Sequence, residues 1–380
     1  MKANGLGSMR RVLALGFAIL GGWSSATAEQ ETAFFRIVSP AGSAIKALSP
    51  GGMLTWTNAT TISVTCTVQR ATTLAGAGNW ADYVLRKVTN ATMVVRVYDA
   101  KPPAGMVFIP EGDVLFNDML DEDMGQYLAS LSYLEAFFMD QYEVTWSKWQ
   151  EVRTWAVSHG YDLAGVGGGK GEQHPVHSVN FFDAAKWCNA RSEKEGLAPY
   201  YYEEPYYSAP YATNVFRTGE PFSEWVAKLT SRSGATGYRL PSIEAWEKAA
   251  RGGLSARRFP WGNTITHSQA NYYSTTNYPY DASVSKGYHP LYDEGAEPFT
   301  SPVGSFVPNG FGLYDICGNV RELSGSFYWG MGGWGRTYSI YAGGSWKQNA
   351  SLCRMAFAYD FSGQHARETD LGFRCIRPAR

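Results

Sequence analysis

Charge is scarce in this sequence, and neither sign dominates. Of the 380 residues, 18% are Asp, Glu, Lys or Arg, and the formal net charge is -1. A chain with so little net charge offers no bulk electrostatic attraction to a nucleic acid or a membrane surface. We therefore expect neither of them as a partner.

Long apolar runs are also missing after the N-terminal region. No later stretch approaches the ~18 apolar residues that indicate a transmembrane helix. The N-terminal run "VLALGFAILGGW" is short, follows Arg10 and Arg11, and precedes Ala26-Thr27-Ala28, which has the form of a signal cleavage site. Residues 1–28 are therefore predicted to be a signal peptide, with a retained membrane anchor as the alternative. The mature protein is expected to be exported, to the periplasm, the cell surface or the extracellular space.

Histidine and cysteine are few and poorly spaced for metal chemistry. The six histidines show no i, i+4 pair on a predicted helix and no zinc-like spacing, so a histidine-rich metal site is not expected. The five cysteines are an odd number, which leaves at least one thiol unpaired within the chain. Cys66 lies far from the others in a strand-like run, and we expect it to be a buried free thiol.

Aromatic residues and glycine, by contrast, are abundant. Aromatic side chains make up 15% of the sequence, and there are 41 glycines. This composition predicts a loop-rich fold pinned by large buried side chains, with a sugar- or peptide-binding surface as the alternative interpretation. After Gly253, about 50 residues show neither helical nor strand periodicity, which is typical of long structured loops.

The chain divides into two parts at "AKPPAG", where two prolines favour an extended linker. Residues 29–100 contain short runs rich in Val, Thr, Tyr and Trp, and they predict a small all-β, sandwich-like domain. Residues 101–380 mix strand-like runs with three predicted helices, which begin near Trp146, after the cap Asn180 and after the cap Ser242. The predicted fold class is α+β.

Eight segments of the second part, in order, resemble one known family. They read "MVFIPEG", "FFMDQYEVTWSKW", "HPVHSVNFFDAAKWCNARSEKEG", "YRLPSIEAWEKAARGG", "FPWGN", "PVGSFVPNGFGLYDICGNVREL", "YAGGSW" and "LGFRC". Together they resemble the sulfatase-modifying-factor domain, whose best-known members are the formylglycine-generating enzymes. The resemblance covers about residues 105–378 and implies a loop-rich, mixed α/β domain of the C-type-lectin-like class.

The resemblance also implies a chemistry from which this sequence departs. The active enzymes oxidise a cysteine of a sulfatase with oxygen and a copper ion held by two thiolates, because soft sulfur ligands suit Cu(I). The matching segment here, "WKQNASLC", is shorter and offers only Cys353; the positions that match the thiol pair, Gln348 and the vicinity of Ala350, carry no sulfur. Arg321 replaces a tryptophan that lines the active site in those enzymes. Copper is therefore not expected, and only Cys353 and Ser345 remain as candidate catalytic residues.

Calcium, as a structural ion, is the cofactor that the resemblance does imply. A hard cation prefers many oxygen ligands, and a glycine lets the chain turn its carbonyls inward. The first implied set comprises the carboxylates of Asp315 and Glu322 and the backbone carbonyls of Gly318 and Val320. A second set comprises Asn271, the Tyr272 carbonyl and Asp293, although Glu294 and Glu297 compete for the acidic position. The alternative for the first set is that Asp315 caps a turn and Glu322 forms a salt bridge.

Cys188 and Cys375 match two positions that form a disulfide in the family. For Cys317 and Cys353 three possibilities stay open: a disulfide between them, two free buried thiols, or a reactive Cys353. Only Arg354 and Lys347 lie near enough in sequence to lower the pKa of the Cys353 thiol.

Two functions are consistent with these observations. The first is a non-catalytic, exported protein that binds a protein, a peptide or a glycan, either as a free binding protein or as a component of the cell envelope. The second is a metal-dependent oxidoreductase that acts on a protein cysteine or another substrate.

Overall fold

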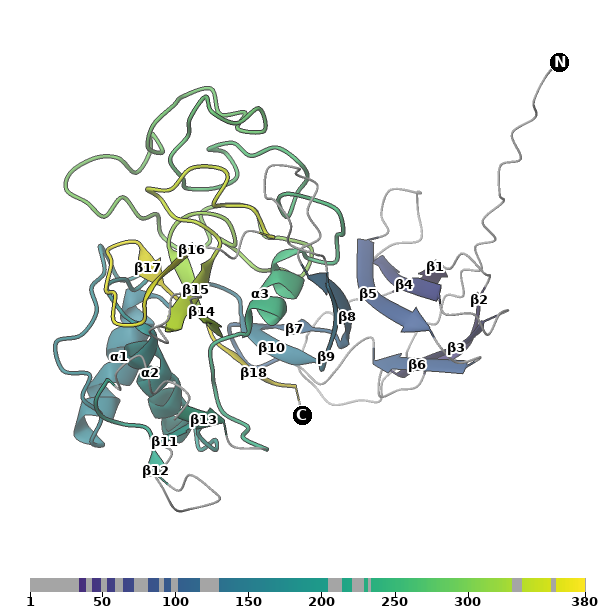
Figure 1. The fold of residues 1–380 in the computed structure, drawn as a ribbon, viewed down its shortest axis with the longest axis horizontal. Helices are drawn as coiled ribbons and strands as arrows, with labels where there is room; N and C mark the ends of the chain where they lie inside the picture. Colours follow the sequence, from purple (N-terminus) through teal and green to yellow (C-terminus); the bar gives the residue numbers. More distant parts are fainter. Residues whose placement is uncertain are drawn as a thin grey trace, which may run out of the picture. The chain divides into compact units, whose positions relative to one another are not determined.

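The computed structural model describes most of the second part of the chain and the strands of the first. The described ranges are 34–38, 43–48, 53–58, 64–71, 81–88, 92–96, 102–116, 130–203, 214–220, 229–231, 234–329, 337–356 and 360–379. The chain divides into two compact units (Figure 1). Unit 1 contains residues 1–101, 110–114 and 131–136, and unit 2 contains the remainder.

Unit 1 is built from antiparallel strands. The larger sheet has the order β1 (Phe34–Val38), β4 (Val64–Ala71), β5 (Ala81–Val88), β8 (Gly112–Phe116) and β9 (Ser130–Leu134). The smaller sheet has the order β2 (Ser43–Leu48), β3 (Met53–Asn58) and β6 (Thr92–Arg96). Buried positions alternate along the strands, as in Leu54 and Trp56 of β3 and Cys66 and Val68 of β4, because successive side chains of a strand point to opposite faces.

No pattern in the sequence predicts that β8 and β9 join this sheet. The segment "MVFIPEGDVLF" forms the two strands β7 (Met106–Ile109) and β8. However, β7 pairs with β10 (Phe137–Asp140) in unit 2, whereas β8 lies beside β5. Local periodicity cannot reveal which sheet a strand joins, since pairing is a long-range contact.

Unit 2 contains the three helices α1 (Trp146–Ser158), α2 (Phe181–Lys194) and α3 (Ile243–Ala250). The predicted caps Asn180 and Ser242 are confirmed. The Asn180 side chain accepts the Asp183 N–H, the Asp183 carboxylate accepts the Asn180 N–H in return, and the Ser242 hydroxyl accepts the Ala245 N–H. Such caps satisfy amide groups that a helix leaves unpaired in its first turn. None of the described helices is long and apolar enough to cross a membrane.

Three small sheets complete unit 2. Their strand orders are β18 (Ile376–Pro378), β10 and β7; β16 (Asp360–Gly363), β15 (Thr337–Ala342), β14 (Arg321–Trp329) and β17 (Leu371–Gly372); and β12 (Asn214–Val215), β11 (Tyr201–Glu203) and β13 (Leu229–Ser231). Residues 251–320, all described, contain no helix or extended strand and form the long loops drawn in green in Figure 1. The expectation of a loop-rich α+β domain is confirmed.

Large aromatic side chains form the core under these loops. Trp149, Trp187, Trp246 and Trp346 are fully buried. The rings of Trp149 and Trp187 stack at 5.8 Å, and Phe373 meets both edge-on. Helices α1 and α2 are thereby joined to the C-terminal segment through ring contacts that add to the burial of apolar surface.

One glycine allows two loops to approach each other closely. Gly318 has φ +83°, and a Cβ placed on it would lie 2.2 Å from the carbonyl oxygen of Asn271. The neighbouring Asn319 N–H donates to that same oxygen at 2.8 Å. Because any larger residue would force this contact apart, Gly318 is required for the geometry of the loop that begins at Asp315.

The sulfur atoms of Cys188 and Cys375 lie 3.4 Å apart in the core. The structure thus brings together the two cysteines that the resemblance paired. All five cysteines are present as thiols, so the disulfide stays a prediction.

Candidate functional site

A group of charges in unit 2 lies between the start of β14 and the turn "GGSW", which follows β15. We call it the Arg321 cluster and define it as Arg321, Ser345, Lys347, Glu368 and Asp370. Arg321 donates to both oxygens of Asp370, from Nε at 3.1 Å and from Nη2 at 2.9 Å, and Nη2 also reaches Glu368 at 2.7 Å. Lys347 Nζ lies 2.9 Å from Asp370, and the Ser345 hydroxyl donates to the same carboxylate at 2.7 Å.

Parallel pairing of β14 with β17 positions this cluster. Arg321 lies opposite Leu371, and the Arg321 N–H donates to the Asp370 carbonyl at 2.8 Å. On the other side, Gly343 and Gly344 take positive φ, and this turn brings Ser345 to the carboxylate. Residues more than 20 positions apart in sequence are therefore held together by backbone as well as by charge.

The cluster has a buried base and a half-exposed rim. Asp370 and Ser345 are fully buried and Arg321 is 4% exposed, whereas the side chains of Lys347 and Glu368 are 36% and 39% exposed. Burial opposes ionisation of Asp370, but the charge and hydrogen bonds of Arg321, with Lys347 and Ser345, outweigh it and lower the pKa of that carboxyl. Asp370 is thus an anion, and the two rim charges are the parts that a ligand can reach.

Ser345 is not arranged as a nucleophile. Its hydroxyl hydrogen is directed at a carboxylate whose oxygens are already shared by Arg321 and Lys347. An activated serine needs a neighbouring base that is free to take its proton and an open side for the substrate. Ser345 is fully buried, so its geometry serves to hold Asp370 in place.

Cys353 is equally remote from solvent. It is fully buried, and burial raises the pKa of its thiol well above the ordinary value, with a further contribution from the charge of Asp281. The nearby backbone N–H of Gly318 opposes this rise in pKa only in part. Since the thiolate is the form that attacks electrophiles and binds soft metals, Cys353 is held in its unreactive form.

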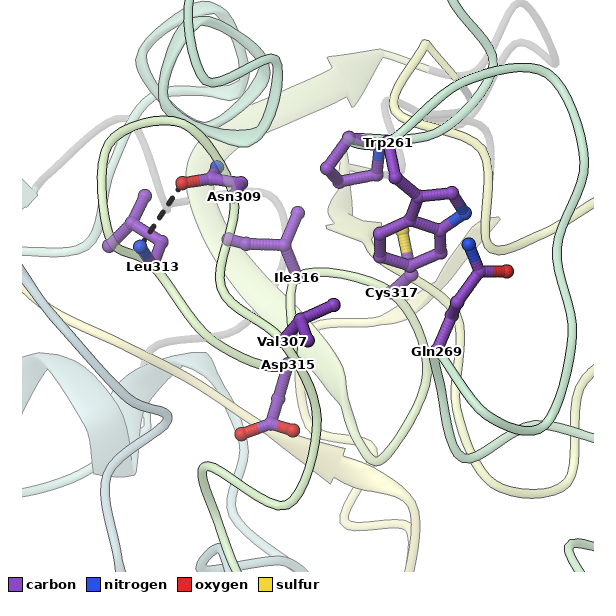
Figure 2. A pocket seen from close by; sticks show the side chains of 9 residues that line it. Trp261, Gln269, Val307, Asn309, Leu313, Asp315, Ile316 and Cys317 are labelled. Carbon is purple, nitrogen blue, oxygen red and sulfur yellow. Dashed lines mark hydrogen bonds between the residues drawn. The ribbon is translucent and has the colours of Figure 1, made fainter. Parts of the chain in front are cut away.

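Cys317 interacts electrostatically with Cys353. The pKa of the Cys317 thiol is raised, first by burial and then by Cys353 and Glu322. Cys317 lines a crevice with Trp261, Gln269 and Val307, shown in Figure 2. The crevice is too narrow to admit a water molecule, so it does not open either sulfur to a substrate.

In the first implied calcium set, Asp315 has a free oxygen that suits a cation, whereas Glu322 already forms a salt bridge. Asp315 is buried and its Oδ1 has no hydrogen-bond partner. Glu322, however, receives Arg374 through two bonds of 2.6 and 2.8 Å, and Trp246 Nε1 donates to it at 2.7 Å. The salt-bridge alternative for Glu322 is therefore present in the structure.

A third carboxylate shares this region. Glu143, which the sequence analysis did not single out, accepts the Val320 N–H and the Asn319 amide, and burial with the charges of Asp315 and Glu322 raises its pKa. Three buried carboxyls thus face one guanidinium, a balance that favours an added cation. Even so, no three His, Cys, Asp or Glu side chains in the described ranges converge on one metal position. Calcium at Asp315, Gly318, Val320 and Glu322 stays a prediction.

The second implied set is less compact. Asn271 Oδ1 is buried without a partner, which suits a ligand, but the Tyr272 carbonyl already accepts from His267 Nε2 at 3.1 Å. Asp293 is exposed. The carboxylate bonded to the Tyr272 side chain is instead that of Asp281, whose bond to the Tyr272 hydroxyl is 2.6 Å.

Sequence reasoning missed Asp370, Glu368 and Glu143 because nothing local distinguishes them from surface acids. Their roles arise from contacts across 21 to 177 positions. The replacement of tryptophan by Arg321 was the one available signal, since an arginine at a buried position requires an anion nearby.

The fold is a loop-rich α+β domain, and buried salt bridges centre on Arg321 at the start of β14. Residues 94–379 match the family described as "Sulfatase-modifying factor enzyme 1-like domain", and the chain belongs to this family. Formylglycine-generating enzymes are among its relatives.

Three similar proteins illustrate the range of the family. "Chaperone protein LppX" of Paenibacillus barcinonensis is 30% identical over 251 residues, which are 64% of this chain and 81% of that protein. "Inactive C-alpha-formylglycine-generating enzyme 2" of Mus musculus is 35% identical over 153 residues, which are 38% of this chain and 44% of that protein. The solved structure of CarF superposes with a TM-score of 0.54 at 26% identity, covering 73% of this chain and 98% of that one.

Removing either of the two cations of the Arg321 cluster is expected to lower the free energy of unfolding, but by different amounts. Arg321→Met should lower the free energy of unfolding by about 3 kcal/mol, because it leaves the buried Asp370 with only part of its compensation. Lys347→Met, at the half-exposed rim, should lower it by less than about 1 kcal/mol. Urea unfolding at neutral pH measures both, and equal losses would contradict the distinction between base and rim.

The raised pKa of Asp315 predicts that the free energy of unfolding decreases as the pH rises. Burial raises the pKa of Asp315 to about 6, above its ordinary value, so folding favours the protonated form. With calcium removed, the free energy of unfolding should therefore decrease by about 2–3 kcal/mol between pH 4 and 7 through this group. Asp315→Asn should abolish that component, because an amide does not titrate.

Calcium would reverse this behaviour. If the predicted ion binds, calcium should raise the melting temperature of the native chain at pH 7 and leave that of Asp315→Asn unchanged. A calcium-independent melting temperature in both proteins would show the calcium prediction to be wrong. A pH profile that Asp315→Asn leaves unaltered would contradict the account of the Asp315 carboxyl.

Proposed function

We propose that this chain is an exported, non-catalytic member of the family that binds a protein, a peptide or a glycan. The observation that carries the proposal is the state of Cys353. It is fully buried with a raised pKa, and the turn that precedes it contributes a carboxylate-bound serine rather than a second sulfur. A two-thiolate copper site of the kind implied by the resemblance needs ionised, accessible sulfur.

The rim of the Arg321 cluster is the proposed contact with the ligand. Lys347 and Glu368 are half-exposed and of opposite charge, and both are fixed from beneath by Asp370 and Arg321. Preorganised charges of this kind favour a polar ligand with complementary groups, because little side-chain freedom is lost on binding. The relatives whose names include "chaperone" and "inactive" support a role without turnover.

One observation favours the alternative, a metal-dependent oxidoreductase. Cys353 contributes to the raised pKa of the Cys317 thiol, so two thiols from different loops lie in one neighbourhood. Movement of the loops would be needed to expose them. In that case copper would bind through Cys317 and Cys353 rather than through two sulfurs of one segment.

Copper titration separates the two functions. The reduced protein should bind less than one tenth of an equivalent of Cu(I) in competition with a chromophoric chelator, and it should not convert a sulfatase-derived cysteine peptide to an aldehyde. Cys353→Ser should leave both results unchanged, since the thiol takes part in neither.

Stoichiometric Cu(I) binding that Cys353→Ser and Cys317→Ser each abolish would establish the oxidoreductase instead. Cys66→Ser serves as the matched control, because Cys66 is also buried but belongs to unit 1. A formylglycine signal in the mass spectrum of the peptide would overturn the proposal directly.

A further inference from the structure

The most exposed large apolar side chains of the described residues all belong to the long loops of unit 2. Val284 is 102% exposed, Leu291 76% and Val307 61%, whereas the other exposed large apolar residues of the described chain lie at 46% or below. Isolated exposed apolar residues are normal on protein surfaces, but contiguous ones mark interaction sites. The question is whether these three belong to one surface.

Two buried histidines connect the loops from which these side chains project. The rings of His267 and His289 are 4.9 Å apart, and His289 Nε2 contacts the carbonyl of His267 at 2.7 Å. His267 bonds to Ser283 and Ser285, on either side of Val284. The position of Val284 is thereby fixed relative to the histidine pair.

The same pair fixes the other two side chains. The Leu291 N–H donates to His289 Nδ1 at 3.2 Å. The ring of Phe306, which precedes Val307, lies 5.6 Å from that of His289 and 6.3 Å from that of Tyr292. The loops that carry Val284, Leu291 and Val307 are therefore held by the same histidine pair, so little ordering is needed when these side chains are covered.

The exposed charges near these three side chains are mostly acidic. Asp293, Glu294 and Glu297 are exposed, and none forms an ion pair with any described residue. Between Phe259 and Val320 the sequence contains a single Lys or Arg, Lys286. Lys286 is held by Asp281, with Nζ 3.2 Å from the carbonyl and 3.6 Å from the carboxylate. The surface is therefore apolar and locally acidic, although the chain as a whole is almost neutral.

We propose that this acidic–apolar surface, defined by Val284, Leu291, Val307, Asp293, Glu294 and Glu297, docks a polypeptide segment in which Lys or Arg residues flank apolar side chains. Apolar side chains would cover the three exposed aliphatic groups, and the cations would pair with carboxylates that have no cation of their own. An anionic membrane surface would be repelled by the same carboxylates. The surface lies outside the Arg321 cluster, so its failure would leave the function proposed above untouched.

Binding of a short fluorescent peptide in which lysine alternates with leucine tests this inference on the full-length chain. The affinity should fall with ionic strength, because the exposed charges are screened by salt. Replacing lysine by glutamate, or leucine by serine, in the peptide should each weaken binding by about tenfold or more.

Variants of the protein should mirror those of the peptide. Leu291→Ser with Val307→Ser, and separately Asp293→Asn with Glu294→Gln and Glu297→Gln, should each weaken binding about tenfold. The matched control is Val157→Ser, which removes an exposed valine from α1 and should bind as the native protein does. All these positions are at least one third exposed or at a loop surface, so the folded state should persist, as circular dichroism checks.

Three results would overturn the inference. They are equal affinity for the lysine and glutamate peptides, equal affinity of the surface variants and the native protein, and failure of the lysine peptide to bind at low ionic strength. Sedimentation velocity adds a fourth: if the native chain is a dimer and the surface variants are monomers, a second copy of the chain covers the surface instead of a basic segment.

Discussion

The buried ion pair between Arg374 and Glu322 is the interaction on which the architecture of unit 2 depends. Both side chains are at most 1% exposed. Arg374 donates to the carbonyls of Asp140, Gln141 and Tyr314 as well as to the carboxylate, and Trp246 of α3 donates to that carboxylate too. The C-terminal segment, β10, α3, β14 and the loop before β14 thus meet at one guanidinium. Removing one member of such a pair leaves an uncompensated buried charge, a loss of about 3–5 kcal/mol.

A second buried pair, Arg321 with Asp370, lies one residue away along β14. Glu322 and Arg321 are consecutive strand residues, so their side chains leave the strand in opposite directions. Glu322 pairs with Arg374 in the core, and Arg321 pairs with Asp370 beneath Lys347 and Glu368. The function proposed above rests on this arrangement, in which ion pairs fill the site and the neighbouring thiol is buried and held in its unreactive form.

Much of the fold could be predicted from the sequence because its signals are local. The caps at Asn180 and Ser242, the helices they begin, and the irregular chain after Gly253 all follow from short-range patterns. The assignment of β8 and β9 to the sheet of unit 1 could not be predicted, because strand pairing depends on distant partners. The same limit applies to the site: Cys353 and Ser345 were identified by motif, but their burial and the carboxylate that holds Ser345 come from residues elsewhere in the chain.

The resemblance located the departures from the enzymes, and the structure gives them a physical meaning. The sequence "WKQNASLC" lacks a second thiol, which shows only that the usual copper ligands are missing. The Cys353 sulfur packs so closely against Gly344 that a Cβ placed on this glycine would lie 2.6 Å from the sulfur. The remaining thiol therefore has no open side in this conformation. Gly344 also has φ +70°, so the turn that encloses the sulfur is itself dependent on glycine.

Alkylation of Cys353 in the native protein tests the central claim most directly. Native, reduced protein is exposed to iodoacetamide at neutral pH, quenched and digested, and the modified fraction of each cysteine is measured by mass spectrometry. The account predicts that Cys353 stays unmodified until the protein is unfolded, because its thiol is buried and its pKa is raised. Rapid modification of Cys353 in the folded chain would contradict it and would return a reactive thiol to this site.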